Sequence, residues 1–272
     1  MFNTPKSTFR SFLLLSIGIL GFGDVMVFSA AQVLGLQSGG SSFAVSWKQI
    51  VISIFAFLGA WVIAQFPMKT IKFFAHRSLG IAVIVMLLLI PFGRDVNGNT
   101  NWISIGPIDF QPSEVAKVFL ILWAAYIIDN NYGNARKITS TLVIGFGLVL
   151  LVVLRGGDLG SAVVIGLIFI TLIYLAGADI KVIATLGGLG VLGVAALIVA
   201  QPYRIARFTA FVHPFADGIY KNAGWQPAHS LMALGSGGLF GSGIGTSKQK
   251  WGNLAEAHTD FIFGVIGEEF GL

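Results

Sequence analysis

The chain has 272 residues, of which 55% are hydrophobic and only 11% are charged, and its formal net charge is +5. In a soluble domain about a quarter of the residues are charged, so a soluble fold with this composition would have too few charged side chains to cover its surface. A surface that faces lipid can be apolar, so the composition favours a membrane protein. The chain contains no cysteine, which excludes disulfides, thiolate metal sites and cysteine nucleophiles. Its positive charge does not indicate nucleic acid, because basic residues in membrane proteins first report topology.

Apolar segments follow one another along the chain, each long enough or nearly long enough to cross a bilayer. They predict an all-α polytopic membrane protein with seven transmembrane helices, a truncated eighth helix, and a large extracytoplasmic loop between helices 7 and 8. The predicted helices cover residues 12–31, 49–66, 78–92, 113–128, 139–154, 161–178 and 182–200, and the eighth begins near Phe261 and is cut off at Leu272. The first segment resembles a signal peptide, but its length and the lack of a clear cleavage site favour a retained helix.

The distribution of Lys and Arg predicts a cytoplasmic N-terminus. With that orientation the inside segments hold Lys6, Arg10, Lys69, Lys72, Arg77, Arg136, Lys137 and Lys181, whereas the short outside loops hold only Lys48, Arg94 and Arg155. The long segment 201–260 then lies outside, and long loops are exempt from the rule. We expect residues 1–272 to form one transmembrane domain, with the segment 201–260 folded back onto the outer mouth of the bundle.

Two outside loops stand out by composition. The segment 93–112 contains the turn dipeptides Asn97-Gly98 and Gly106-Pro107. The segment 201–260 is long for a loop and rich in glycine, which indicates a functional segment. Its glycines could simply permit tight turns, or they could expose backbone N–H groups that bind an anion beside Lys248 and Lys250. Their spacing is not that of a nucleotide-binding loop.

Charged residues inside predicted helices are costly and tend to mark sites or pathways. Asp24 lies in the first helix, where it is expected to be protonated or paired with a cation from another helix. Glu114 and Lys117 are three residues apart on one face of the fourth helix, so they can neutralise each other. A structural ion pair is the simpler interpretation of these two residues, and the lining of a cavity is the alternative.

Other carboxylates lie at the ends of predicted helices or in the truncated one. Asp158 sits in a tight outer turn, where it can cap the sixth helix. Glu268 and Glu269 are expected to face a cavity or the inner surface. Asp260 precedes the eighth helix: from chemistry alone a helix cap is the simpler interpretation, and a general base of raised pKa at the membrane interface is the alternative.

Three blocks of the sequence resemble the signatures of the SEDS family (shape, elongation, division, sporulation). The first block comprises residues 98–103 and 111–114 with Lys117, the second is 158–160, and the third runs from Tyr203, Arg204 and Arg207 through Pro214, Gln226, Ser230, Gly237, Gly238, Gly241, Gly243, Gly245, Gln249 and Lys250 to residues 256–263. The resemblance covers the chain from about Ser29 to its end. The wording of the last block resembles the division branch of the family more than its elongation branch.

This resemblance implies a peptidoglycan glycosyltransferase that polymerises lipid II, an undecaprenyl-diphosphate-linked disaccharide-pentapeptide, during cell division. Its location would be the outer face of the bacterial cytoplasmic membrane, at the division septum. The implied partners are lipid II, undecaprenyl diphosphate, a class B penicillin-binding transpeptidase and other membrane proteins of the division machinery, and no nucleic acid. No cofactor is evident; a divalent cation, Mg²⁺ or Mn²⁺, is a candidate, but no cluster of metal ligands is visible.

The resemblance also implies roles for particular residues. Asp260 corresponds to the family's essential aspartate and would be the general base. The expected substrate and diphosphate contacts are Arg204, Arg207, Lys248, Lys250 and Trp102, since cations would stabilise the leaving diphosphate. The residues expected to shape the cavity or support it are Gln111, Glu114, Lys117, Asp158, Gln226, Glu256 and His258.

The chain departs from the family pattern at a few positions. Asn101 stands where the family has arginine, Gly157 and Ala255 stand where it has proline, and the family continues for about two and a half further spans. These departures leave Asp260 intact. The alternatives to the glycosyltransferase are a lipid II flippase, which would need a charged path across the membrane, and a non-catalytic division scaffold that recruits a transpeptidase.

Overall fold

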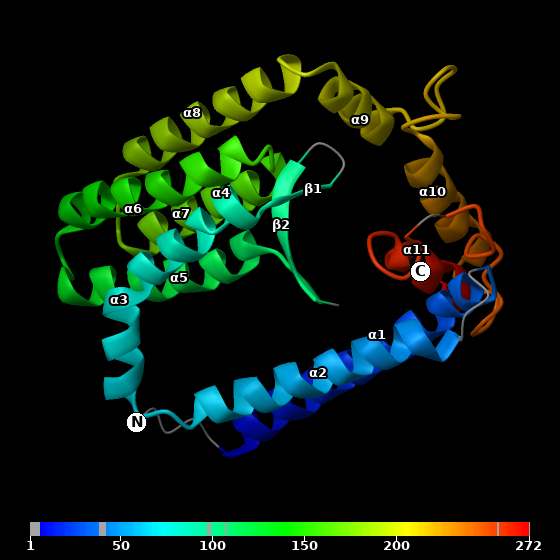
Figure 1. The fold of residues 1–272 in the computed structure, drawn as a ribbon, viewed down its shortest axis with the longest axis horizontal. Helices are drawn as coiled ribbons and strands as arrows, with labels where there is room; N and C mark the ends of the chain where they lie inside the picture. Colours follow the sequence, from blue (N-terminus) through cyan, green and yellow to red (C-terminus); the bar gives the residue numbers. More distant parts are fainter. Residues whose placement is uncertain (1–5, 38–41, 97–98, 107, 255, 272) are drawn as a thin grey trace. The chain divides into compact units, whose positions relative to one another are not determined.

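The computed structural model of the chain describes residues 6–37, 42–96, 99–106, 108–254 and 256–271 (Figure 1). It divides into two compact units, one formed by residues 1–65 and 201–272 and the other by residues 66–200. The first unit contains α1 (Lys6–Gln37), α2 (Ser42–Ala64), α9 (Pro202–Val212), α10 (Trp225–Gly237) and α11 (Ile262–Phe270). Its long helices α1 and α2 pack side by side, and α11 contacts both α1 and α10.

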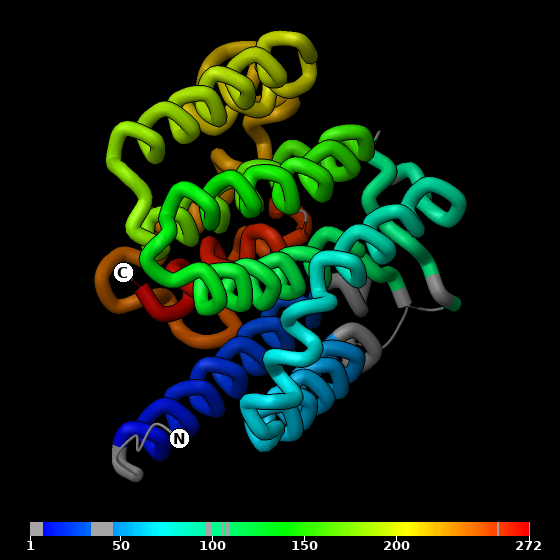
Figure 2. The backbone as a smooth tube through the Cα atoms, turned by 90° about the vertical axis from the view of Figure 1, so that its left-hand side faces the viewer, coloured from blue at the N-terminus to red at the C-terminus, as the bar shows by residue number. Residues whose placement is uncertain are grey.

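The second unit is a bundle of helices with a small sheet at one end. It contains α3 (Met68–Leu87), α4 (Leu89–Phe92), α5 (Pro112–Asn130), α6 (Ala135–Arg155), α7 (Leu159–Leu175) and α8 (Ile180–Val199). Helices α5, α6 and α7 contact one another in every pairing (Figure 2). Pro112 occupies the first turn of α5, where its missing N–H costs nothing and its fixed φ suits a helix.

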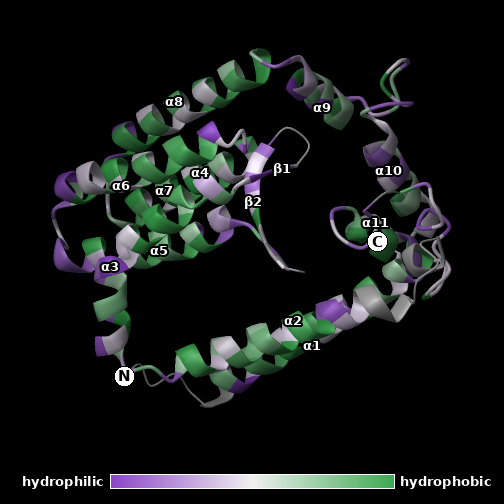
Figure 3. Cartoon of the chain, viewed as in Figure 1, coloured by the Kyte–Doolittle hydropathy of each residue, from purple (hydrophilic) through white to green (hydrophobic). Residues whose placement is uncertain are grey.

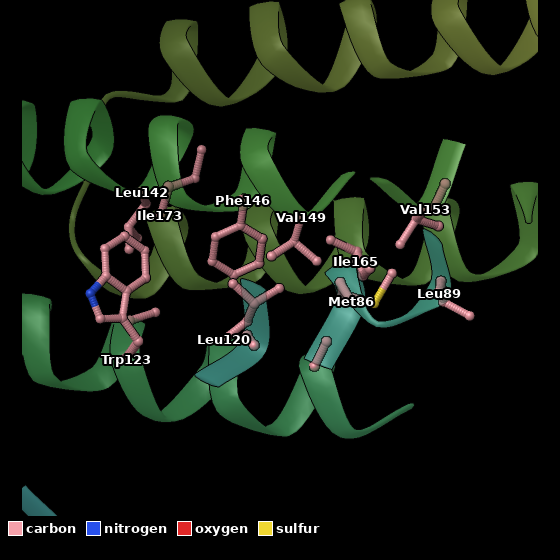
Figure 4. Close-up of a cluster of buried hydrophobic side chains, with 14 of the residues drawn as sticks. Met86, Leu89, Leu120, Trp123, Leu142, Phe146, Val149, Val153, Ile165 and Ile173 are labelled. Carbon is pink, nitrogen blue, oxygen red and sulfur yellow. The ribbon is translucent and has the colours of Figure 1, made fainter. Parts of the chain in front are cut away.

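Most side chains in the core of this second unit come from α3, α5, α6 and α7 (Figure 4). Leu120, Leu142 and Val149 are fully buried within it. These residues recur at helical spacing, so each helix turns one apolar stripe toward the bundle axis. The opposite stripes are also apolar and are exposed, as expected where lipid replaces water.

Helices occur in all eight places where the sequence predicts them, and five are long and apolar enough to cross a membrane among the described residues. These five candidate spans are Thr8–Val33, Ser46–Ala64, Met68–Phe92, Ala135–Arg155 and Ile180–Val199. Figure 3 shows apolar residues along α1, α2 and α8, and α8 buries none of its side chains. Helix α5 carries Glu114, Lys117 and Asp129, and α7 has only 17 residues, so a total of seven spanning helices stays a prediction.

The expectation of an all-α fold is wrong for the segment 93–112, which forms a three-stranded antiparallel sheet in the order β1-β2-β3. Its strands are β1 (Arg94–Val96), β2 (Asn99–Ile105) and β3 (Ile108–Phe110). Thr100, Trp102 and Ile103 have high strand propensity, and antiparallel pairing satisfies backbone groups that an irregular loop would leave open. Asn97, Gly98 and Pro107 of the predicted turns lie outside the described residues.

The segment 201–260 is not a continuous loop, because α9 and α10 lie within it. The eighth predicted helix is α11, a short helix of 9 residues. Small residues let α10 approach α11 closely: a Cβ on Gly237 would collide with the carbonyl oxygen of Gly267, and one on Gly264 would come within 2.8 Å of Ser230 Oγ. Small residues serve the same purpose between membrane helices generally.

This close approach predicts opposite effects for two glycines of α10. Gly237→Ala should lower the free energy of unfolding by roughly 1–3 kcal/mol, the usual cost of overpacking, because backbone cannot move aside cheaply. Gly235→Ala should be neutral or stabilising by up to about 1 kcal/mol, since its Cβ would meet no atom and alanine favours a helix. Thermal unfolding of both variants in detergent measures the difference, and equal midpoints would contradict the packing described.

Candidate functional site

Asp260 lies on an exposed turn two residues before the first residue of α11. The N-cap of α11 is Phe261, and no side chain caps this helix, so the interpretation of Asp260 as a helix cap is wrong. The turn is closed by hydrogen bonds that the N–H groups of Thr259 and Phe261 donate to the carbonyl oxygen of Glu256. The carboxyl group of Asp260 therefore projects from a hydrogen-bonded turn rather than from a helix terminus.

Buried apolar side chains on both sides of this turn in the sequence hold it in place. Leu254 and Ala257 are buried in a small cluster with Met26 of α1 and Val265 of α11. Glu256, next to Ala257, has a φ of 52°, a left-handed conformation that is uncommon for residues other than glycine. The segment before Asp260 is thus held in a specific shape, which suits a residue that must meet a substrate in a fixed position.

Glu256 and His258 are both part of this turn. The carboxylate of Glu256 accepts a hydrogen bond from Thr259 Oγ1 at 3.1 Å, so it supports the turn. His258 is half-buried, and its Nδ1 is buried without a hydrogen-bond partner among the described residues.

Gln226 is half-buried in the first turn of α10. Trp225 beside it donates a hydrogen bond from Nε1 to the carbonyl oxygen of Asn253 at 2.7 Å, which ties α10 to the segment before Asp260.

The predicted anion cradle of the glycine-rich segment holds the protein's own Glu268. The carboxylate of this buried residue accepts hydrogen bonds from Ser247 Oγ at 2.6 Å, Lys248 N at 2.9 Å and Gln249 N at 3.3 Å. Backbone N–H groups arranged in this way form an anion-binding nest. From the sequence, the glycines could permit tight turns or expose N–H groups for an anion. The N–H donors to Glu268 belong to Lys248 and Gln249 instead, and the anion is a side chain of α11.

The neighbouring carboxylate of Glu269 forms a buried ion pair with Lys250. Lys250 Nζ donates to Glu269 Oε1 at 2.8 Å and to Ser29 Oγ of α1 at 3.0 Å. Ser29 also donates to Glu269, and the backbone of Gly245 adds another hydrogen bond to the carboxylate. Gly243 and Gly245 have φ values of 107° and 82°, which glycine adopts without strain. Neither Ser29 nor the two glutamates were identified as a cluster from the sequence.

This arrangement changes the expected roles of two lysines. The side chain of Lys250 is 1% exposed and its ammonium group is already neutralised, so its assignment to the substrate diphosphate is corrected to a structural ion pair. The expectation that Glu268 and Glu269 face a cavity or the inner surface is also wrong, because both carboxylates are enclosed by protein. Lys248 is exposed, and only its backbone N–H binds Glu268.

The two arginines lie together on α9. Arg204 and Arg207 are three residues apart and both lie against the ring of Tyr203, with guanidinium-to-centroid distances of 5.5 and 5.9 Å. Arg204 Nε also donates to the hydroxyl of Tyr203 at 3.0 Å. Arg207 is exposed and Arg204 is half-buried. Helix α9 thus presents two guanidinium groups on neighbouring turns, a grouping that can bind a phosphate through several N–H donors.

Asp158 connects the segment 93–112 to the turn between α6 and α7. It is the N-cap of α7, which is the sixth predicted helix, so the predicted capping role is confirmed. Its Oδ1 accepts a hydrogen bond from Ser161 N at 2.9 Å, and its Oδ2 accepts one from Ser161 Oγ at 2.7 Å. Asn101 of β2 and Gln111 before α5 each donate to the same Oδ2 at 3.1 Å. The sheet, the start of α5 and the start of α7 therefore meet at one carboxylate.

Asp158 lies between α6 and α7, outside the candidate spans. Burial raises the pKa of its carboxyl group, but the hydrogen bonds from Ser161, Asn101 and Gln111 outweigh burial and hold the pKa below its ordinary value. A depressed pKa means that the folded state favours the charged carboxylate. Its contribution to stability is fully present above the unfolded pKa of about 4 and is lost as the pH falls through the folded pKa.

Asp158→Asn should therefore lower the free energy of unfolding at neutral pH by about 1.5–3 kcal/mol, the worth of hydrogen bonds to a charged group. The destabilisation should shrink as the pH falls below about 4, because protonation removes the same charge from the native protein. Asp179 is a matched control, since it caps α8 through a single bond to Lys181 N. Thermal unfolding from pH 7 to pH 3 measures the effect, and equal losses for Asp158→Asn and Asp179→Asn would refute the network.

Glu114 and Lys117 form the predicted ion pair, with Lys117 Nζ 2.7 Å from Glu114 Oε1. Both residues lie on α5, so the pair does not itself join two helices. Asp24 accepts a hydrogen bond from Ser53 Oγ of α2 at 2.9 Å, so the partner found for it is a hydroxyl group. Of its two expected states, pairing with a cation is not the one observed, and protonation stays a prediction. Trp102 is half-buried in β2.

The described part of the chain contains no group of three or more His, Asp or Glu side chains arranged to hold a metal ion. A divalent cation, Mg²⁺ or Mn²⁺, stays an expectation, because Mg²⁺ is commonly held by one or two carboxylates together with substrate phosphates. Ala255, where the family pattern has proline, lies outside the residues that the structure describes.

Comparison with known proteins identifies relatives along nearly the whole chain. The family model for FtsW, RodA and SpoVE, described as "Cell cycle protein", matches residues 9–272. A protein of Tolumonas auensis is 36% identical over 98% of this chain and 69% of its own length. One of Escherichia coli O157:H7 is 34% identical over 96% of this chain and 64% of its own length. Both carry the name "Probable peptidoglycan glycosyltransferase FtsW", and this chain spans about two thirds of their length.

Solved structures share the fold. A chain from a peptidoglycan synthase complex, reported for the coordination of polymerization and crosslinking, superposes with a TM-score of 0.67 at 22% identity over 97% of this chain and 71% of that one. A mutant of the Thermus thermophilus rod shape determining protein RodA superposes with a TM-score of 0.59 at 22% identity over 96% of this chain and 66% of that one.

Proposed function

The chain belongs to the FtsW, RodA and SpoVE family of cell cycle proteins, and we propose that it contributes the glycosyltransferase centre of a peptidoglycan synthase that polymerises lipid II. Its resemblance to the SEDS family is thereby confirmed. The relatives named as probable peptidoglycan glycosyltransferases support the proposed activity. The observation that carries the proposal is Asp260, an exposed carboxyl group on a turn anchored by buried Leu254 and Ala257.

In the proposed reaction, Asp260 accepts the proton of the 4-hydroxyl group of the acceptor sugar. That oxygen attacks the anomeric carbon of the donor sugar, the bond from this carbon to the diphosphate breaks, and undecaprenyl diphosphate leaves with the bonding electrons. Negative charge develops on the diphosphate, where cations stabilise the transition state most. Arg204 and Arg207 on α9 are the proposed partners of this group, together with exposed Lys248. No step of the proposal uses a metal ion.

The proposed location is the bacterial cytoplasmic membrane at the division septum, with the N-terminus in the cytoplasm and the segment 201–260 outside. The five apolar candidate spans support a membrane location. A class B penicillin-binding transpeptidase is the proposed partner. A chain of the same fold occurs in a peptidoglycan synthase complex that coordinates polymerization and crosslinking.

The decisive experiment supplies purified full-length protein in detergent with labelled lipid II and scores glycan chains on a gel. Polymer formation by this protein alone supports the glycosyltransferase. Movement of lipid II between the leaflets of proteoliposomes without polymer would favour a flippase. Neither activity, with retained binding of the transpeptidase, would favour a scaffold.

A further inference from the structure

The three-stranded sheet of the second unit has two chemically different faces. Ile103 pairs with Phe110 across β2 and β3, and both side chains belong to the apolar core of the bundle. The residues on either side of Ile103 point the other way, because side chains alternate along a strand. Trp102 pairs with Arg94 of β1, and Ser104 pairs with Asp109 of β3. Pairing thus places these four side chains together on the outer face.

These four side chains line a shallow pocket with a volume of about 140 Å³. Trp102 is half-buried, whereas Arg94, Ser104 and Asp109 are exposed. Ser104 Oγ donates a hydrogen bond to Asp109 Oδ1 at 2.7 Å, which orients the carboxylate. Pockets that enclose a whole drug-sized ligand begin at about 300 Å³, so this one suits a fragment the size of one ring.

The chemistry of the pocket matches a sugar ring. An indole offers an apolar face, and a guanidinium, a hydroxyl and a carboxylate offer donors and acceptors around it. A pyranose ring has the complementary surface, with C–H groups on one face and hydroxyl or acetamido groups along its edge. A diphosphate fits poorly, because the charge of Arg94 is balanced by that of Asp109, whose oxygens would repel an anion.

We propose that the outer face of this sheet, formed by Arg94, Trp102, Ser104 and Asp109, is a binding subsite for one uncharged N-acetylated sugar ring of a glycan. The identity of the glycan rests on the proposed function, but binding of the ring does not depend on turnover. Trp102 therefore contacts a sugar, and the substrate contact expected at this residue is not one with the diphosphate. The ring belongs either to lipid II or to the growing strand.

The test measures binding of a fluorescently labelled β-1,4-linked N-acetylglucosamine tetramer to the full-length protein in detergent, by fluorescence anisotropy. Trp102→Ala should raise the Kd at least tenfold, and Trp102→Phe should restore most of the affinity because it keeps an aromatic face. Asp109→Asn should raise the Kd about fivefold. Asp129→Asn is the matched control, since it removes an exposed carboxylate near the C-terminal end of α5, where it pairs with Lys72 outside the pocket, and should leave the Kd unchanged.

Two further arms identify the ligand. Polymerisation assays of Asp109→Asn distinguish the two sources of the ring, and either result supports the subsite. A higher KM for lipid II shows that the ring belongs to lipid II. Shorter products at an unchanged KM show that it belongs to the growing strand. Three results would overturn the proposed subsite. They are failure of the tetramer to bind, equal Kd values in all folded variants, and binding of inorganic diphosphate that depends on Arg94. Because tetramer binding needs no catalysis, retained binding of the tetramer with an absence of polymerisation would refute only the proposed function.

Discussion

Asp260→Asn should abolish polymerisation of lipid II while leaving the protein folded and inserted in the membrane. Asparagine keeps the shape of the side chain but cannot accept the proton of the attacking hydroxyl. Loss of a general base costs about 10²–10⁴-fold in rate. The turn itself should survive, because its hydrogen bonds run between the backbones of Glu256, Thr259 and Phe261 and its anchors are buried apolar side chains.

The matched control for this substitution is Asp217→Asn, which removes an exposed carboxylate from the same segment between α8 and α11. Both variants are purified in the full-length protein and compared by initial rates of glycan formation and by thermal unfolding. A wild-type rate for Asp260→Asn would exclude this residue as the base. A rate lost equally in Asp217→Asn would indicate a general effect of charge.

Lys250→Met should be the most destabilising of the substitutions considered, with a loss of about 3–5 kcal/mol in the free energy of unfolding. Removing one partner of a buried ion pair leaves the other charge uncompensated in a poorly solvated place. Here the uncompensated group would be Glu269, whose carboxylate would keep Ser29 as a partner and lose its cation. The measurement is thermal or denaturant unfolding in detergent micelles.

A double substitution separates the pair from its surroundings. Lys250→Met combined with Glu269→Gln removes both charges, so much of the stability should return, because an apolar or neutral replacement of a buried pair is often tolerated. Lys248→Met is the matched control, since this lysine is exposed and only its backbone N–H binds Glu268. Additive losses in the double variant would show that Lys250 and Glu269 do not act as a pair.

The sequence predicted the features that depend on local chemistry. Apolar runs located the helices because a membrane helix needs about twenty apolar residues. The capping role of Asp158 and the ion pair of Glu114 with Lys117 follow from spacings of three residues. The sheet was missed although a signal was available: turn dipeptides at 97–98 and 106–107 flank a run containing Thr100, Trp102 and Ile103, a pattern that favours a hairpin.

Other features depend on contacts between distant residues and could not be read from one sequence. Lys250 is a plausible phosphate ligand by type, and only the fold places Glu269 and Ser29 around it. The nest around Glu268 has the same origin, because its N–H donors belong to Lys248 and Gln249 and only the fold shows which anion they bind. A side chain on α11 can occupy this nest without the loss of translational freedom that a separate ligand would suffer.

The hydrogen bonds between α11 and the glycine-rich segment also hold the turn that carries Asp260 in place. Glu268 and Glu269 bind the stretch that precedes the turn of Asp260, and α11 follows that turn, so the turn is fastened at both ends. The conformational entropy of ordering these residues is therefore lost during folding. In the proposed reaction, a glycan acceptor that reaches Asp260 would encounter a preorganised carboxylate. Binding energy that would otherwise order the loop would then remain available to align the reacting sugars.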